Sequence, residues 1–152
     1  MRLVTYRFEG RDRIGVVSGE QVADVSAVAP DMNGLIARLD EGLAEARRAA
    51  EAATKTPLSQ VQLRAPIPRP LKNILCLGRN YKEHAAEGGA VPTPDPIWFT
   101  KPPSSVCGPY DDIMLEPRLS QQNDWEVELA VVIGRPGRWI DKERAWEHVY
   151  GY

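Results

Sequence analysis

Apolar and polar positions along the chain first alternate and then recur at helical spacing. Three short alternating runs, residues 3–8, 14–17 and 22–25, are separated by Gly10 and Gly19. Alternation with period two, interrupted by glycines, is typical of short β-strands joined by tight turns. The first 26 residues therefore predict a small meander or hairpin.

A helical segment follows these runs. Pro30 and Asp31 introduce it, and apolar residues recur every three or four positions from Leu35 to Ala46. Residues 44–53 are rich in Ala, Glu and Arg, which favour helices, and residues 54–57 end the pattern. We expect one continuous helix here.

Residues 66–70, Pro-Ile-Pro-Arg-Pro, hold three prolines in five positions. Proline removes a backbone donor and fixes φ, so this stretch fits neither a helix nor a central strand. It predicts a linker between a small N-terminal accessory domain of residues 1–65 and a second domain of residues 71–152.

The second domain has a β-rich pattern interrupted by prolines. A helical turn over 81–86, a turn over 134–137 and a last helix over 142–149 with Asp141 as its N-cap complete the pattern. The predicted strands cover residues 73–77, 97–100, 113–115 and 125–133, and the last of these is the longest.

Composition excludes several classes of function. The net charge is −2 and there is no basic block, so a nucleic-acid partner is not indicated. No apolar run approaches the roughly 20 residues that cross a bilayer, and the N-terminus turns polar early, so we expect a cytoplasmic protein with no membrane partner. Cys76 and Cys107 have no metal-binding spacing and predict two reduced, partly buried thiols.

Glu126 and Glu128 interrupt the longest apolar run. In a strand, residues two apart point to the same side of the sheet, so both carboxylates would share one face. Because the run is apolar on nearly both faces, the pattern predicts a buried strand, where two close anions need compensation. A divalent cation would supply it, and carboxylate oxygens favour Mg²⁺, Mn²⁺ or Ca²⁺. The alternative is an exposed polar face of an amphipathic strand.

His84 and Glu87 are three residues apart in the predicted helical turn. That spacing places them side by side, and a carboxylate beside an imidazole raises its basicity, as a general base requires. The alternative is a solvated helical turn. Residues 99–105 place Lys101 at a strand end before two prolines and two serines, which indicates an anion-binding loop or an ordinary one.

In their order and spacing, these segments resemble the fumarylacetoacetate hydrolase family. The resemblance covers residues 60–152, whereas the N-terminal part fits the small leading domain of many members without a specific motif. The matching motifs are Ile74-Leu75-Cys76-Leu77-Gly78-Arg79-Asn80-Tyr81-x-x-His84-x-x-Glu87, Phe99-x-Lys101-Pro102 with Ser104-Ser105, Asp124-Trp125-Glu126-Val127-Glu128-Leu129-Ala130-Val131-Val132-Ile133-Gly134, and Ala145-x-x-x-Val149-x-Gly151-Tyr152.

The resemblance implies an α+β, β-rich fold whose second domain is an incomplete mixed β-sandwich roll. It implies a Mg²⁺ or Mn²⁺ ion held by Glu126, Glu128 and a downstream aspartate, and a 2-oxo acid substrate. His84 would activate water and Glu87 would orient it, while Arg79 and Lys101 are weaker candidates for contacting substrate carboxylates. Members usually form homodimers.

The chain departs from the family pattern after Tyr152, where members continue to the third carboxylate and a lysine. We therefore expect it to be the N-terminal portion of a member. The leading hypothesis is a metal-dependent hydrolase that cleaves a carbon–carbon bond in acylpyruvate-like acids. Isomerisation or decarboxylation of a 2-oxo diacid on the same site is the second hypothesis, and a catalytically silent fragment is the third.

Overall fold

The computed structural model describes residues 1–81, 83, 86 and 95–152. They form two compact units, one made of Met1–Pro68 with Cys107–Tyr152 and the other of Arg69–Val106. The division into an accessory and a catalytic domain remains a prediction. The structure combines strands and helices and is rich in β-structure, which confirms the predicted α+β class.

An antiparallel sheet forms from the alternating runs at the N-terminus. The three predicted strands are confirmed, and they form a meander whose turns place Gly10 and Gly19 at φ of +76° and +57°. Two further short strands join it, so the order is β4-β3-β2-β1-β5. The strands are β1 (Arg2–Phe8), β2 (Arg11–Ser18), β3 (Gln21–Asp24), β4 (Lys55–Pro57) and β5 (Gln62–Leu63).

Two helices, α1 (Met32–Ala37) and α2 (Leu39–Ala52), replace the single predicted helix. Asp31 caps α1 by accepting a hydrogen bond from the Gly34 amide at 2.8 Å. Leu39 adopts φ of +48°, a left-handed conformation that a continuous helix cannot contain. The periodicity was therefore read correctly as helical, but the continuity across residue 39 is wrong.

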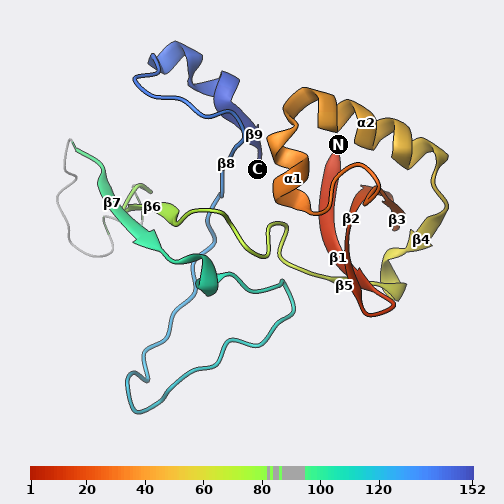
Figure 1. Ribbon diagram of the computed structural model, residues 1–152. Helices are drawn as coiled ribbons and strands as arrows, with labels where there is room; N and C mark the ends of the chain where they lie inside the picture. The colour runs from red at the N-terminus through yellow and green to blue at the C-terminus, as the bar shows by residue number, and fades with distance from the viewer. Residues whose placement is uncertain (82, 84–85, 87–94) are drawn as a thin grey trace. The chain divides into compact units, whose positions relative to one another are not determined.

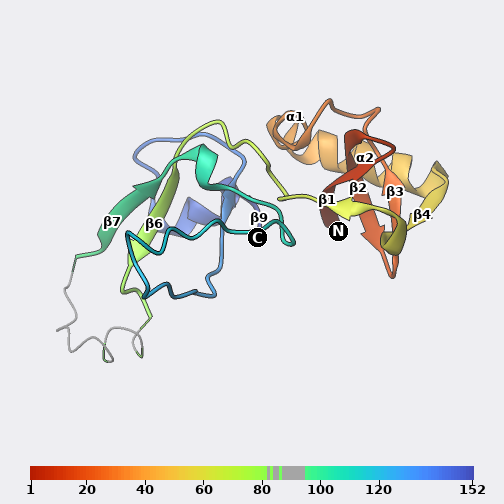
Figure 2. The same cartoon turned by 90° about the horizontal axis from the view of Figure 1, so that it is seen from below.

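The apolar faces of these helices and of the sheet share one core. Figures 1 and 2 show α2 alongside the sheet of β1–β3, and the contacts of α2 are with β2 and β3. The linker contributes as well, because Ile67 packs against the core and the Thr5 hydroxyl donates to the Pro66 carbonyl at 2.6 Å. The buried residues of the core are Ile14, Ala23, Val25, Ala29, Met32, Leu35, Ala46 and Ala50.

The unit of Arg69–Val106 contains a two-stranded antiparallel hairpin. Strands β6 (Ile74–Gly78) and β7 (Ile97–Lys101) confirm two predicted strands, and their register pairs Ile74 with Lys101 and Gly78 with Ile97. A short 3-10 helix, η2 (Pro103–Ser105), follows β7. The helical turn predicted over 81–86 lies mostly outside the described residues.

The C-terminal part contains far less regular structure than predicted. Only β8 (Val132–Ile133) forms from the run 125–133, and it pairs with β9 (Val149–Gly151). The predictions of a strand over 113–115 and of a buried strand over 125–131 are wrong, since both stretches are exposed and lie outside any strand. A strand of this composition becomes buried only when neighbouring strands and covering elements surround it, and the two-stranded β8–β9 sheet provides neither.

The last helix is present as a 3-10 helix, η3 (Lys142–His148). Asp141 precedes it as predicted, but its side chain makes no capping hydrogen bond, so that detail is wrong. Both cysteines are free, with Cys76 buried and Cys107 exposed, which corrects the expectation of burial for Cys107. Among the described residues, no helix has the length and apolar character needed to cross a bilayer.

Candidate functional site

Glu126 and Glu128 lie in an exposed, irregular stretch that leads into β8. Asp124 precedes them, and its carboxylate accepts a hydrogen bond from the Trp125 amide at 2.8 Å. The three carboxylates alternate with Trp125 and Val127, so the sequence pattern of a strand is retained without the strand itself. The burial that made the glutamate pair costly in the sequence-based prediction is absent here.

The glutamate pair does not by itself make a metal centre. Its carboxylate oxygens have the hard-ligand chemistry of a Mg²⁺ or Mn²⁺ site. Within the part of the chain that the structure describes, however, no three His, Cys, Asp or Glu side chains come together in a way that could hold an ion. Mg²⁺ and Ca²⁺ require six or more ligands, so two exposed glutamates do not fit such an ion without groups from elsewhere.

Arg79 and Lys101 both belong to the hairpin unit. Arg79 follows the last residue of β6 and has φ of +55°, whereas Lys101 ends β7 opposite Ile74, the first residue of β6. Five residues of extended strand separate these ends, which is roughly 17 Å at about 3.4 Å per residue. The hairpin thus presents the two cations at opposite ends, and the Lys101 ammonium lies 5.9 Å from the centre of the Phe99 ring.

The predicted catalytic pair, His84 and Glu87, lies outside the described residues. The other histidine, His148, has a structural role at the end of η3. Its Nδ1 donates to the Arg135 carbonyl at 2.8 Å, and its own carbonyl accepts from the Gly134 amide at 2.9 Å. This histidine therefore fixes the turn after β8, which agrees with its interpretation as a packing residue.

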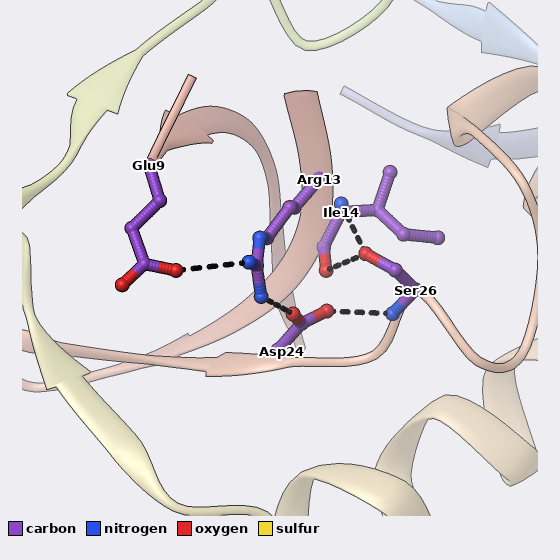
Figure 3. Close-up of polar contacts among 5 residues, drawn as sticks. All are labelled: Glu9, Arg13, Ile14, Asp24 and Ser26. Carbon is purple, nitrogen blue, oxygen red and sulfur yellow. Dashed lines mark hydrogen bonds and ion pairs between the residues drawn. The ribbon is translucent and has the colours of Figure 1, made fainter. Parts of the chain in front are cut away.

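A polar network in the N-terminal sheet went unnoticed in the sequence (Figure 3). Arg13 pairs with Asp24 at 2.7 Å and with Glu9 at 3.5 Å. Asp24 also accepts from the Ser26 amide at 2.8 Å, and the Ser26 hydroxyl accepts from the Ile14 amide at 3.1 Å. Arg13 and Asp24 alternate with apolar residues on neighbouring strands, a cross-strand pairing that the meander itself could have indicated.

The charges in this network compensate each other. Burial by itself raises the pKa of Asp24, but the hydrogen bonds from Ser26 and Arg13 outweigh it and lower that pKa. Burial, followed by the nearby Asp24 charge, raises the pKa of Tyr6. Because the named acceptors and donors are satisfied by one another, the network closes the end of β3 and has the character of a structural clasp.

Tyr150 in β9 has a buried hydroxyl. Among the described residues it has no hydrogen-bond partner, and burial raises its pKa to about 12. Its side chain lies against Gly134, where an added Cβ would come within 2.9 Å of the Tyr150 Cβ and 3.2 Å of a Leu39 methyl group. Glycine at position 134 is thus required by the close approach of the chain at this turn.

Comparison with known proteins identifies the family of this chain. The sequence profile described as "Fumarylacetoacetate (FAA) hydrolase C-terminal" matches residues 73–152. An oxaloacetate tautomerase of Bacillus subtilis is 45% identical over 128 residues, covering 77% of this chain and 42% of that protein. A mitochondrial oxaloacetate tautomerase of Bos taurus is 41% identical over 164 residues, covering 100% of this chain and 51% of the relative.

Solved structures agree with the sequence comparison. A fumarylacetoacetate hydrolase of Exiguobacterium antarcticum matches with a TM-score of 0.77 and 34% identity, over 99% of this chain and 53% of that one. A maleylpyruvate hydrolase of Sphingobium sp. SYK-6, in complex with manganese (II) ion and pyruvate, matches with a TM-score of 0.76 and 30% identity, over 100% and 56% of the two chains.

The chain spans about half the length of the relatives it matches. The profile nevertheless covers the segments that carry Arg79, His84, Glu87, Lys101 and the two glutamates. The resemblance noted in the sequence is therefore confirmed over the region where its motifs lie. This chain belongs to the fumarylacetoacetate hydrolase family.

Proposed function

We propose that this chain supplies part of the active site of an enzyme that acts on a small 2-oxo acid. The observation that carries the proposal is the family match over residues 73–152, together with relatives that are named as oxaloacetate tautomerases and hydrolases. The shared chemistry of those two activities defines the substrate class. Both act on an acid whose carbon next to the 2-oxo group gains or loses a proton.

Tautomerisation of a 2-oxo diacid is the first candidate. A base removes a proton from the carbon next to the keto group, the electron pair forms the enolate, and a proton on the oxygen completes the enol. Relatives with this activity share 41–45% identity with the chain, against 30% for the maleylpyruvate hydrolase. The higher identity favours tautomerisation over hydrolysis.

Hydrolysis of an acylpyruvate is the second candidate, and it is supported by the structural match to the maleylpyruvate hydrolase. Water adds to the distal carbonyl carbon, the carbon–carbon bond breaks, and its electron pair stays on pyruvate as the enolate. Protonation of that enolate is the reverse of the first step of tautomerisation. One site can therefore serve either reaction, depending on whether it admits a water molecule next to the distal carbonyl.

In both reactions we assign the proton transfer to His84, with Glu87 holding its charge and tautomer. Arg79 and Lys101 are assigned to substrate carboxylates; their separation along the hairpin suits two different carboxylate groups better than one. A divalent ion, Mg²⁺ or Mn²⁺, belongs to the proposal through Glu126 and Glu128, supported by the manganese in the maleylpyruvate hydrolase structure. The active form is proposed to be a homodimer.

The test uses this chain joined, in the order found in the relatives, to the part of the Bacillus subtilis tautomerase that it does not match. We expect the fusion to accelerate enol–keto conversion of oxaloacetate, followed by the absorbance of the enol. His84→Gln should lower that rate at least 100-fold, in line with the contribution of a general base. The His148→Gln variant is the matched control and should retain the rate.

Loss of acetylpyruvate without oxaloacetate tautomerisation would select the second candidate. If the fusion is folded and accelerates neither reaction, or if His84→Gln retains full activity, the proposal and the role of His84 are respectively wrong.

A further inference from the structure

The stretch 125–133 exposes an unbroken row of large apolar side chains. Monomeric proteins rarely leave contiguous apolar surface of this kind in water unless it binds something. Each of these side chains occupies an odd-numbered position, so in an extended conformation they would share one face. Their exposed fractions are 81% for Trp125, 82% for Val127, 67% for Leu129, 47% for Val131 and 61% for Ile133.

The same stretch already enters a sheet at one end. Val132 pairs with Gly151 and Ile133 pairs with Val149, which makes β8 a strand. Residues 125–131 continue in the direction of β8 along the sequence but belong to no helix or strand. A chain with strand composition that leads into an existing strand is a template for strand addition, in which main-chain hydrogen bonds give affinity and the apolar face gives specificity.

The charge pattern argues against a second copy as the partner. Any antiparallel register that matches apolar residues to apolar residues also places even-numbered positions opposite even-numbered ones. Glu126 and Glu128 of both copies would then lie on one face of the sheet, and like charges at cross-strand distances destabilise pairing. The partner should therefore be a different strand, apolar on one face and without this concentration of carboxylates on the other.

The comparisons indicate where such a strand occurs. The Exiguobacterium antarcticum structure superposes on 99% of this chain, yet only 53% of its own length is used in doing so. The rest of that protein is available to cover and pair with the equivalent of residues 125–133. No covering element for this stretch is found among the described residues of our chain, where all of its large apolar side chains are exposed.

We propose that residues 125–133 are a docking surface for a second polypeptide stretch, equivalent to the part of the relatives that this chain does not match. That stretch adds a β-strand alongside 125–131 and covers the row of odd-numbered side chains. Strand addition also aligns Glu126 and Glu128 on one face, about 7 Å apart at the usual rise per residue. The ion-binding consequence rests on the proposed function, whereas the docking surface rests on exposure and pattern alone.

The test measures assembly and not turnover. This chain is mixed with the unmatched part of the Exiguobacterium antarcticum protein, and separately with that of the Bacillus subtilis relative, each produced as its own polypeptide. We expect hydrogen exchange of the amides of 127–131 to slow at least tenfold in a one-to-one complex, and the emission of Trp125 to shift to shorter wavelength. A version of the Exiguobacterium protein divided at the same place is the positive control.

A pair of matched variants locates the surface. Val127→Lys should weaken the complex at least tenfold, whereas Leu119→Lys, at an equally exposed apolar position outside the stretch, should change it less than twofold. In titrations followed by Mn²⁺ electron paramagnetic resonance, the complex should bind Mn²⁺ more tightly than the chain alone, and E126Q/E128Q should remove the difference without disrupting the complex.

Three results would overturn the docking surface: unchanged exchange of 127–131 with both polypeptides, equal effects of the two lysine variants, or a homodimer of this chain alone that already protects 127–131. The outcome is independent of the proposed function. A protected complex without turnover would leave the docking surface intact and refute the activity, whereas turnover without protection would do the reverse.

Discussion

The N-terminal 65 residues and the stretch 107–133 use apolar residues at comparable spacing, yet they reach opposite outcomes. In the first region α1, α2 and the five-stranded sheet bury one another's apolar faces. In the second region the apolar residues are exposed, and regular structure is limited to the two residues of β8. An apolar pattern thus specifies which side of a segment is to be buried, and the partner that buries it must come from somewhere else.

The contrast is sharpest for a pair of leucines. Leu35 is 0% exposed in the core, whereas Leu129 is 67% exposed. Leu35→Ala should lower the free energy of unfolding by about 3 kcal/mol, because it removes buried apolar surface and leaves a cavity. Leu129→Ala should change it by less than about 0.5 kcal/mol, as exposed substitutions do. Urea unfolding followed by far-ultraviolet circular dichroism measures both.

Similar losses for the two leucine variants would mean that Leu129 is buried in solution, and the comparison between the regions would fail. Repeating the measurement in the presence of the docking polypeptide sharpens it, since Leu129→Ala should then become costly while the cost of Leu35→Ala stays the same.

A glycine in each region gives a second, smaller contrast. A Cβ at Gly15 in β2 would collide with Val22 and come within 2.9 Å of the Tyr6 ring, whereas one at Gly151 in β9 meets nothing within 4 Å. Gly15→Ala should therefore cost about 2 kcal/mol of unfolding free energy by overpacking. Gly151→Ala should be close to neutral. Thermal melts of the two variants compare them directly, and equal melting temperatures would contradict the tight packing of the sheet.

The smallest predicted effect concerns Tyr150, a buried group within the otherwise exposed C-terminal part. Its pKa is raised from 10.0 to about 12 by burial. The folded state therefore holds this proton more tightly than the unfolded chain, so the stabilising contribution is complete below pH 10 and is lost as pH rises from 10 to 12. Tyr150→Phe should remove that part of the alkaline destabilisation.

Near neutral pH the same substitution should raise stability by up to about 1 kcal/mol, because it removes a buried hydroxyl that has no partner among the described residues. Unfolding free energies of both proteins at several pH values between 7 and 12 measure the difference. An unchanged pH dependence would show that Tyr150 is hydrated in solution.

These contrasts explain which sequence-based predictions succeeded. The meander, the position of the helical region and the β6–β7 hairpin depend on pairing between segments close in the chain, and the local patterns predicted them. The break at Leu39 was missed because Leu35, Ile36, Leu39 and Leu43 keep helical spacing across it. The strand over 125–131 was wrong because alternation indicates burial without identifying a distant partner.

The candidate site was predicted from motifs, and the structure tests only its surroundings. Glu126 and Glu128 are accessible, in contrast to the expected buried pair, and Arg79 and Lys101 mark opposite ends of one hairpin. The Arg13–Asp24 network was missed because its members are far apart in sequence and become neighbours only through the register of β2 and β3.

The unequal exposure of the two cysteines offers a clock for local opening. Cys107 is exposed and Cys76 is buried on β6, so a thiol reagent should modify the first at once and the second only when the hairpin opens. The rate of the slow phase, measured against reagent concentration, would report the free energy of that opening separately from global unfolding. The chain thus contains its own probe of how firmly the segment around β6 is held before any partner arrives.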